Sequence, residues 1–220
     1  GPASGLLLVA GFPHYNLHFL TWVALAPLLL YMRGRSLAWR CAQGYIFGVF
    51  FLGALFYWIT LVRYPAALGY ILFLFILPLQ FVPWAALTGW ALDDNRPAVA
   101  LLFPALGWVA IELAASQGAF ATPWWSLAVS QTANPPVAQI ASWAGMYGIS
   151  FFAVASNVFI YCAATGRLKT SRALWIIVGA AFAVAVAAGA WFAFRKNWNN
   201  GKPVKVSLIQ ANFSQDEKDD

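Results

Sequence analysis

One carboxylate at the end of an apolar segment is the side chain of this protein best placed for chemistry. Glu112 closes a helix-length apolar run, and a loop at residues 116–136 follows it. The loop combines proline, indole, hydroxyl and amide side chains: Pro123, Trp124, Trp125, Ser130 and Gln131. A carboxylate is costly in hydrocarbon, so one at the end of a membrane span marks a candidate functional site. Indole and amide N–H groups beside lipid headgroups can hold the polar part of a phospholipid.

Each of these residues also has a structural interpretation. Glu112 can extend to the interface or bond to a neighbouring helix, and both the structural and the functional interpretation are open. Trp124 and Trp125 can belong to the aromatic belt at a membrane surface. The combination of a carboxylate, two tryptophans after a proline, and a Ser-Gln pair on one loop favours a lipid-facing site.

Other chemistry-bearing residues form no recognisable motif. His14 and His18 are four residues apart, but two ligands are too few for a metal site. Cys41 and Cys162 lie at or near the ends of apolar runs, at a spacing that matches no metal pattern, which predicts free apolar cysteines. The sequence contains neither a glycine-rich phosphate loop nor a GxSxG elbow. We therefore expect neither a metal nor a cofactor.

Composition places these residues in a membrane. Of the 220 residues, 62% are hydrophobic and 9% are charged, whereas a soluble domain carries roughly a quarter charged residues. Apolar runs of about twenty residues recur, each long enough to cross roughly 30 Å of hydrocarbon. The net charge of +6 comes from short basic loops, and no basic run with interleaved aromatics resembles a nucleic-acid groove. The chain is predicted to be polytopic, with membrane lipids and no nucleic acid as partners.

An all-α bundle of about six full spans and a shortened first helix is predicted for residues 1–196. The short apolar run at residues 5–12 is expected to be a helix cut short. Full spans are expected at residues 15–32, 43–62, 68–92, 97–115, 137–164 and 173–194. Pro78 and Pro83 should kink or break the third span, because proline removes a backbone hydrogen bond. Gly44 and Gly48 should allow close approach of a neighbouring helix.

Basic loops predict the orientation of the bundle. The loops after Met32, Leu92 and Ala164 hold most of the positive charge near span ends: Arg33, Arg35, Arg40, Arg96, Arg167, Lys169 and Arg172. The opposite side has Arg63, Arg195 and Lys196. Basic loops stay on the cytoplasmic side, so the loop at 116–136 and everything after Arg195 are expected on the outer face.

The last residues change in character. Residues 197–220 are predicted to be a polar linker and one strand, because residues 204–210 are β-branched and apolar between turn formers. A lone strand leaves its backbone groups unpaired. The chain is therefore expected to stop where an extramembrane domain begins.

Short motifs in a fixed order run along nearly the whole chain. They are Trp22 to Leu29 (WVALAPLL), Gly44-x-x-x-Gly48 with Tyr57-Trp58-Ile59, Pro104 to Trp108 (PALGW) with Glu112, Pro123-Trp124, Ser130-Gln131, Pro136 to Gln139 (PVAQ), Gly145-x-Tyr147-Gly148 with Ser150-Phe151, and Val206 to Asn212 (VSLIQAN) with Gln215. Together they resemble the apolipoprotein N-acyltransferase family of bacterial inner membranes. By this resemblance, Trp124 matches a loop tryptophan near the lipid entrance, and Glu112 matches a carboxylate packed behind it. The expected substrate- and lipid-binding residues are Glu112, Trp124, Trp125, Ser130, Gln131 and Tyr147.

The resemblance implies a multi-pass inner-membrane bundle that carries a periplasmic nitrilase-like α/β domain, of which only the first strand would be present. Such enzymes take an acyl chain from a phospholipid and transfer it to the N-terminal cysteine amine of a diacylated apolipoprotein, through a thioester acyl-enzyme. The catalytic cysteine, glutamate base and oxyanion-binding lysine would lie beyond Asp220. No catalytic residue is assigned in this chain, and the fragment alone is predicted to be inactive.

Several positions depart from the family pattern. Ala121-Thr122 stands where Gly-Phe is usual, Ala128-Val129 replaces Gly-Tyr, and Ala115 replaces an arginine, which leaves Glu112 in need of another donor. These departures motivate an alternative, a divergent acyltransferase with another acceptor. A further alternative is a non-catalytic lipid-binding membrane module. A small transporter would need paired broken helices and several buried charges, which the sequence does not show.

Overall fold

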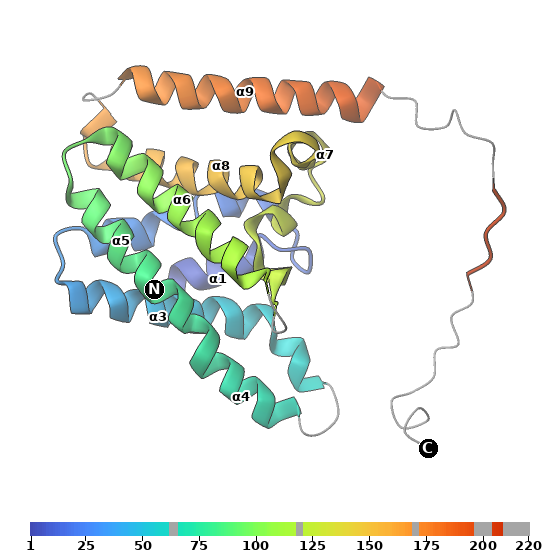
Figure 1. The fold of residues 1–220 in the computed structure, drawn as a ribbon, viewed down its shortest axis with the longest axis horizontal. Coiled ribbons are helices and arrows are strands. Elements are labelled where there is room, and N and C mark those ends of the chain that lie inside the picture. Colours follow the sequence, from blue (N-terminus) through green and yellow to red (C-terminus); the bar gives the residue numbers. More distant parts are fainter. Residues whose placement is uncertain (62–65, 118–120, 169–171, 196–203, 209–220) are drawn as a thin grey trace.

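The structure is a computed structural model that describes residues 1–61, 66–117, 121–168, 172–195 and 204–208 (Figure 1). The regular elements of these ranges are all helical, which confirms the all-α prediction for them. In chain order they are α1 (Pro2–Ala10), η1 (His18–Trp22), α2 (Ala26–Met32), α3 (Leu37–Leu55), η2 (Tyr57–Leu61), α4 (Ala66–Ile76), η3 (Leu77–Gln80), α5 (Phe81–Asp93), α6 (Pro97–Ala115), η4 (Pro123–Trp125), η5 (Leu127–Gln131), α7 (Pro135–Ala138), α8 (Ala141–Ala164) and α9 (Arg172–Arg195), where η marks a 3₁₀ helix.

Four helical segments are long and apolar enough to cross a membrane, in support of a membrane protein. They are Gly69–Asp93, Pro97–Ala115, Ala141–Ala164 and Arg172–Phe194. The expected count of about six full spans is not confirmed. The predicted span at 15–32 contains only a shorter apolar segment, His18–Met32, and α3 contains the polar Arg40 and Gln43 within its 19 residues.

The helix is interrupted between η1 and α2, and α8 supplies hydrogen bonds to the backbone groups that the interruption leaves unpaired. Asn157 accepts from the backbone N–H groups of Leu25 and Ala26 at 2.8 and 2.9 Å, and its amide donates to the carbonyl of Thr21 at 3.0 Å. Pro27, which has no N–H, follows directly. A helix can be interrupted at membrane depth only where neighbouring groups satisfy the freed backbone. The buried amide of Asn157 does this here.

The predicted kink and close helix approach are both confirmed. α4 ends at Ile76, and the 3₁₀ turn η3, which contains Pro78, connects it to α5. A Cβ placed on Gly44 would lie 2.5 Å from the Cβ of Ala85, and one placed on Gly48 would lie 2.9 Å from the Cα of Pro78. The two glycines therefore let α3 lie directly against η3 and α5.

The basic loops gather at one end of the bundle. Figure 1 shows the connections before α3, between α5 and α6, and before α9 at one end, while η4 and α7 lie at the other. Arg40 pairs with Asp93, and Arg167 donates to the carbonyl of Leu92. At this end the partly buried Asp94 accepts hydrogen bonds from Arg96, which lowers the pKa of the carboxyl to about 2. The predicted charge asymmetry therefore holds for the described arginines, whereas Arg63, Lys169 and Lys196 lie outside the described residues.

The predicted strand at 204–210 is not found. Residues 204–208 have no regular secondary structure and are exposed, and positions 209 and 210 lie outside the described residues. A strand exists only through hydrogen bonds to a neighbouring strand, and the described part of the chain contains none. The division at residues 196 and 197 into bundle and nitrilase-like domain stays a prediction.

Candidate functional site

Glu112 lies inside the protein and holds the loop at 121–134 against α6. Its Oε1 accepts from the indole Nε1 of Trp108 at 2.8 Å and from the backbone N–H of Leu127 at 2.9 Å. Its Oε2 accepts from the hydroxyl of Ser126 at 3.0 Å. Trp108 and Glu112 share a helix face because they are four residues apart. Glu112 is only 3% exposed. Its three hydrogen-bond donors, Trp108, Ser126 and Leu127, replace the arginine that was expected at position 115.

Ser130 and Gln131 are also buried, and they attach the loop to the broken segment at η1. The hydroxyl of Thr21 donates to that of Ser130 at 2.8 Å. The amide of Gln131 donates to the carbonyl of His18 at 2.9 Å and accepts from the indole of Trp22 at 3.2 Å. Both side chains are therefore engaged within the protein and are not open to lipid.

Trp124 and Trp125 lie in different environments. Trp125 is 1% exposed, with its ring 5.3 Å from that of Phe81 and 6.0 Å from that of Trp108. Trp124 is 56% exposed, and its ring lies 6.2 Å from that of Phe56. In the 3₁₀ turn η4, successive side chains are about 120° apart, so adjacent tryptophans cannot share one environment. Trp125 belongs to the core, and Trp124 to the surface.

Tyr147 joins the start of the loop to α8. Its hydroxyl lies 3.0 Å from that of Ser116. α8 is kinked at Gly145, whose φ of 64° suits glycine because it has no Cβ. Of the six residues expected to bind substrate or lipid, five therefore make internal contacts around the loop, and only Trp124 is more than half exposed.

An apolar groove that sequence reasoning missed lies between α4 and the loop. It has a volume of about 590 Å³ and is lined by Gly69, Leu72, Phe73, Ile76, Leu77, Ala121 and Thr122. The ring of Phe73 lies 5.1 Å from that of Phe56, which in turn contacts Trp124, so the groove and the exposed tryptophan are neighbours. The α4 stretch shows only hydrophobicity in the sequence, so nothing distinguished it from any other span.

The groove is chemically suited to hold a hydrocarbon chain. Thr122 contributes the one side-chain hydroxyl of its lining, and none of its residues is titratable. The free cysteines Cys41 and Cys162 are not in this lining. No group of three or more metal-ligating side chains occurs among the described residues. The arrangement can bind and orient an acyl chain, and a reactive group would have to come from elsewhere.

Comparison with known proteins identifies the family. The apolipoprotein N-acyltransferase N-terminal domain matches residues 4–159. The apolipoprotein N-acyltransferase of Geobacter metallireducens is 29% identical over 229 aligned positions, which cover 98% of this chain and 43% of that protein. The enzyme of the same name from Nitrosomonas europaea is 29% identical over 230 positions, covering 98% of this chain and 44% of that protein. The chain spans less than half the length of both relatives, and by the match to most of its residues it belongs to the apolipoprotein N-acyltransferase family.

Proposed function

We propose that this chain is the membrane part of an apolipoprotein N-acyltransferase of the bacterial inner membrane. The whole enzyme would move an acyl chain from a phospholipid to the N-terminal cysteine amine of a diacylated apolipoprotein. Family membership supports the acyltransferase assignment. The role of this chain is inferred from the apolar groove beside the exposed Trp124, because the side chains of the groove could contact the acyl chain of a lipid.

The proposed chemistry has two steps, and its reactive groups would be a cysteine, a glutamate and a lysine that this chain does not supply at the groove. A glutamate base would take the proton of a cysteine thiol, and the thiolate would attack the ester carbonyl of the phospholipid to form a thioester. The leaving alkoxide would take the proton back from the glutamate and depart as a lysophospholipid alcohol. The amine of the acceptor would then attack the thioester and release the thiol. The residues of this chain would bind the donor: the groove would hold the acyl chain, and the indole of Trp124 would face the headgroup.

The arrangement of the bundle supports a catalytic domain at the loop end. α9 packs along α7, where a Cβ on Gly189 would come within 2.1 Å of the carbonyl oxygen of Pro136. Figure 1 shows the C-terminal end of α9 at the same end of the bundle as η4 and α7, opposite the basic loops. With the basic loops in the cytoplasm, residues after Arg195 would emerge on the periplasmic side.

A reconstituted assay tests this function. The intact protein in phospholipid vesicles, supplied with a diacylated peptide bearing an N-terminal cysteine, should produce the N-acylated peptide. Replacing Trp124 by alanine should lower kcat/KM about tenfold, as for loss of a substrate-positioning contact. Trp143→Ala is the matched control, because Trp143 is 55% exposed and does not line the groove. Equal activities of the two variants would remove Trp124 from the donor site.

The alternative of a different acceptor rests on positions that depart from the family pattern, two of which are at the groove. Ala121 and Thr122, which depart from the family pattern, both line it. Acylation of another amine or alcohol, with no product from the diacylated peptide, would establish this alternative. Phospholipid retained beside Trp124 with no covalent turnover would instead identify a non-catalytic lipid-binding module.

A further inference from the structure

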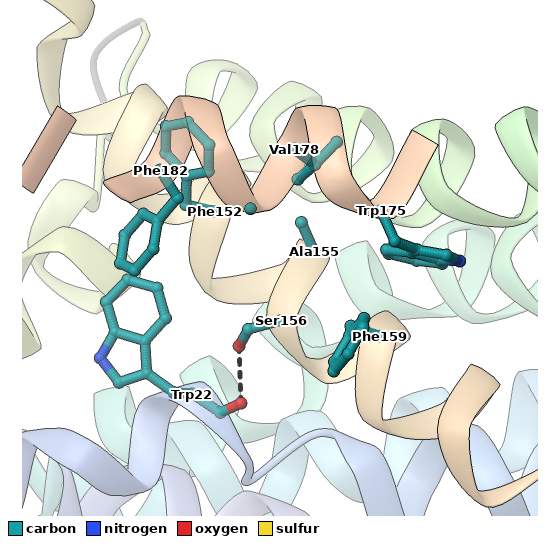
Figure 2. Close-up of a pocket in the computed structure, with 9 residues that line it drawn as sticks. Trp22, Phe152, Ala155, Ser156, Phe159, Trp175, Val178 and Phe182 are labelled. Atoms are coloured by element: carbon teal, nitrogen blue, oxygen red, sulfur yellow. Dashed lines mark hydrogen bonds between the residues drawn. The ribbon is translucent and has the colours of Figure 1, made fainter. Parts of the chain in front are cut away.

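α9 leaves an aromatic hollow between itself and α8. The hollow has a volume of about 250 Å³ and is lined by Trp22, Phe152, Ala155, Ser156, Phe159, Trp175, Val178, Gly179 and Phe182 (Figure 2). The ring of Phe182 lies 4.9 Å from that of Trp22 and 5.2 Å from that of Phe152. The one polar side chain drawn in the middle of the lining, Ser156, already donates to the carbonyl of Trp22 at 2.6 Å. The interior of the hollow is therefore suited to hydrocarbon.

The hollow continues toward the basic end of the bundle. Phe159 and Trp175 also line a second hollow of about 360 Å³, together with Leu168, Arg172 and Ile176. Trp175 lines a third space of about 140 Å³, which has the polar residues Asp94, Asn95 and Arg167 on its wall. The first two volumes together are in the range of ligand pockets, roughly 300–1,000 Å³. An apolar interior thus leads to a polar, arginine-bearing mouth.

Trp175 has an unsatisfied hydrogen-bond donor at this junction. The residue is 8% exposed, and its buried indole N–H has no hydrogen-bond partner in the described part of the chain. In Figure 2 the indole nitrogen lies at the end of the ring away from Trp22 and Phe182. Buried N–H groups are nearly always paired, so this donor is available to an acceptor on a bound molecule.

The charges at the mouth favour an anion. Arg172 is exposed in the first turn of α9. Arg167 donates to the carbonyl of Leu92 and to Asn95, which leaves further N–H groups of its guanidinium available. The carboxylate of Asp94 also faces this space, but Arg96 already neutralises it by a hydrogen-bonded ion pair at 2.8 Å. An anionic oxygen is therefore more favourable here than a cation.

From these observations we propose that the seam between α8 and α9 binds an anionic phospholipid from the leaflet at the basic end of the bundle. One acyl chain lies in the aromatic hollow, an ester oxygen accepts from the indole of Trp175, and the phosphate lies beside Arg172. This lipid is separate from the acyl donor proposed above, because the groove beside Trp124 lies at the opposite end of the bundle. Its role is to fill the seam and hold α9 against α8.

Photo-crosslinking locates the acyl chain. The intact protein is placed in vesicles of phosphatidylcholine that contain phosphatidylglycerol with a diazirine on one acyl chain. After illumination, mass spectrometry should find adducts at Phe152, Phe159 and Phe182, about fivefold above those at the outward-facing Ile177 and Val184. Adducts spread evenly around α9 would overturn the site.

Single substitutions test the acyl-chain hollow and the indole N–H of Trp175 separately. Gly179→Leu should abolish the adducts in the hollow, because a Cβ at Gly179 meets nothing within 4 Å and the side chain can occupy the space. Val184→Leu, on the outward face of the same helix, is its control. Trp175→Phe keeps the aromatic ring but removes the N–H, and should lower the capture of phosphatidylglycerol and phosphatidylcholine alike, by about threefold.

Replacing Arg172 tests whether the site prefers an anionic lipid headgroup. Arg172→Ala should reduce capture of phosphatidylglycerol about fivefold and leave that of a matching phosphatidylcholine probe unchanged. Arg35→Ala removes an exposed arginine of the same basic end outside the hollow, and should have no effect on either probe. Equal capture of the two lipids in all variants, or an unchanged yield in Gly179→Leu, would overturn the proposal without bearing on the acyltransferase assay.

Discussion

The backbone N–H of Leu127 donates to Oε1 of Glu112 over 2.9 Å, between residues fifteen positions apart. The same carboxylate accepts from Trp108 and Ser126. All these groups are buried, so bulk water does not reach them to replace a lost partner. The position of the loop that carries Trp124 thus depends on hydrogen bonds to a buried carboxylate.

Replacing Glu112 by leucine should lower the free energy of unfolding by about 2–4 kcal/mol, because it leaves three buried donors unpaired. Glu112→Gln should cost less, since its amide oxygen can still accept. Thermal unfolding in detergent measures both. Asp94→Asn, in a turn where the carboxylate pairs with the exposed Arg96, is the matched carboxylate control and should change the melting temperature only slightly, because an exposed ion pair contributes little. An unchanged melting temperature in Glu112→Leu would contradict a structural role.

Asn157→Leu should destabilise the broken segment by about 2–4 kcal/mol, because three buried backbone groups lose their partner. The amide protons of Leu25 and Ala26 should then exchange with solvent faster, which hydrogen–deuterium exchange can measure peptide by peptide. Asn95→Leu changes an exposed asparagine and serves as the control. If exchange at the segment were the same in both variants, the bonds from Asn157 would not be what holds it.

Adding a methyl group at Gly44 should destabilise the bundle by about 1–3 kcal/mol, because the new Cβ would lie 2.5 Å from that of Ala85. Gly69→Ala and Gly179→Ala are matched controls on helices, since a Cβ there meets nothing within 4 Å. The controls should be neutral or more stable by up to about 1 kcal/mol, from better helix propensity. Unfolding titrations with a denaturing detergent compare the three, and equal stabilities would contradict close packing of α3 on α5.

Thiol labelling should place the two ends of the bundle on opposite sides of the membrane. In a background without Cys41 and Cys162, a membrane-impermeant maleimide should label Ala133→Cys on intact spheroplasts. It should label Asn95→Cys, at the basic end, only after the membrane is permeabilised. The reverse pattern would put the groove in the cytoplasm and would contradict the proposed function.

Thr122→Phe should narrow the groove beside Trp124. In the reconstituted assay it should lower kcat/KM for long-chain donors about tenfold and for short-chain donors much less, because a long chain needs the whole groove. Thr132→Phe adds the same ring at an exposed position of the same loop outside the groove lining. A loss that is independent of chain length would indicate a general effect of the ring on folding.

Features that depend on local composition were predictable. The apolar helices, the kink at Pro78 and the close approach at Gly44 follow from residues near one another in the chain, because hydropathy, missing N–H groups and missing Cβ atoms act locally. The full-length span expected at 15–32 is not confirmed, because the helix is interrupted between Trp22 and Ala26. Its break depends on Asn157, more than 130 positions away, and no local pattern records that partner.

The sequence by itself determined that this protein is a helical membrane bundle of the apolipoprotein N-acyltransferase family with one basic end. Only the tertiary structure decided that Glu112 and Gln131 face inward, that Trp124 and Trp125 diverge, and that α4 forms a groove with the loop. The physical reason is that hydrophobicity and charge are properties of each local stretch of sequence. A side chain's environment, in contrast, is set by partners from distant helices, which become neighbours only when the bundle packs.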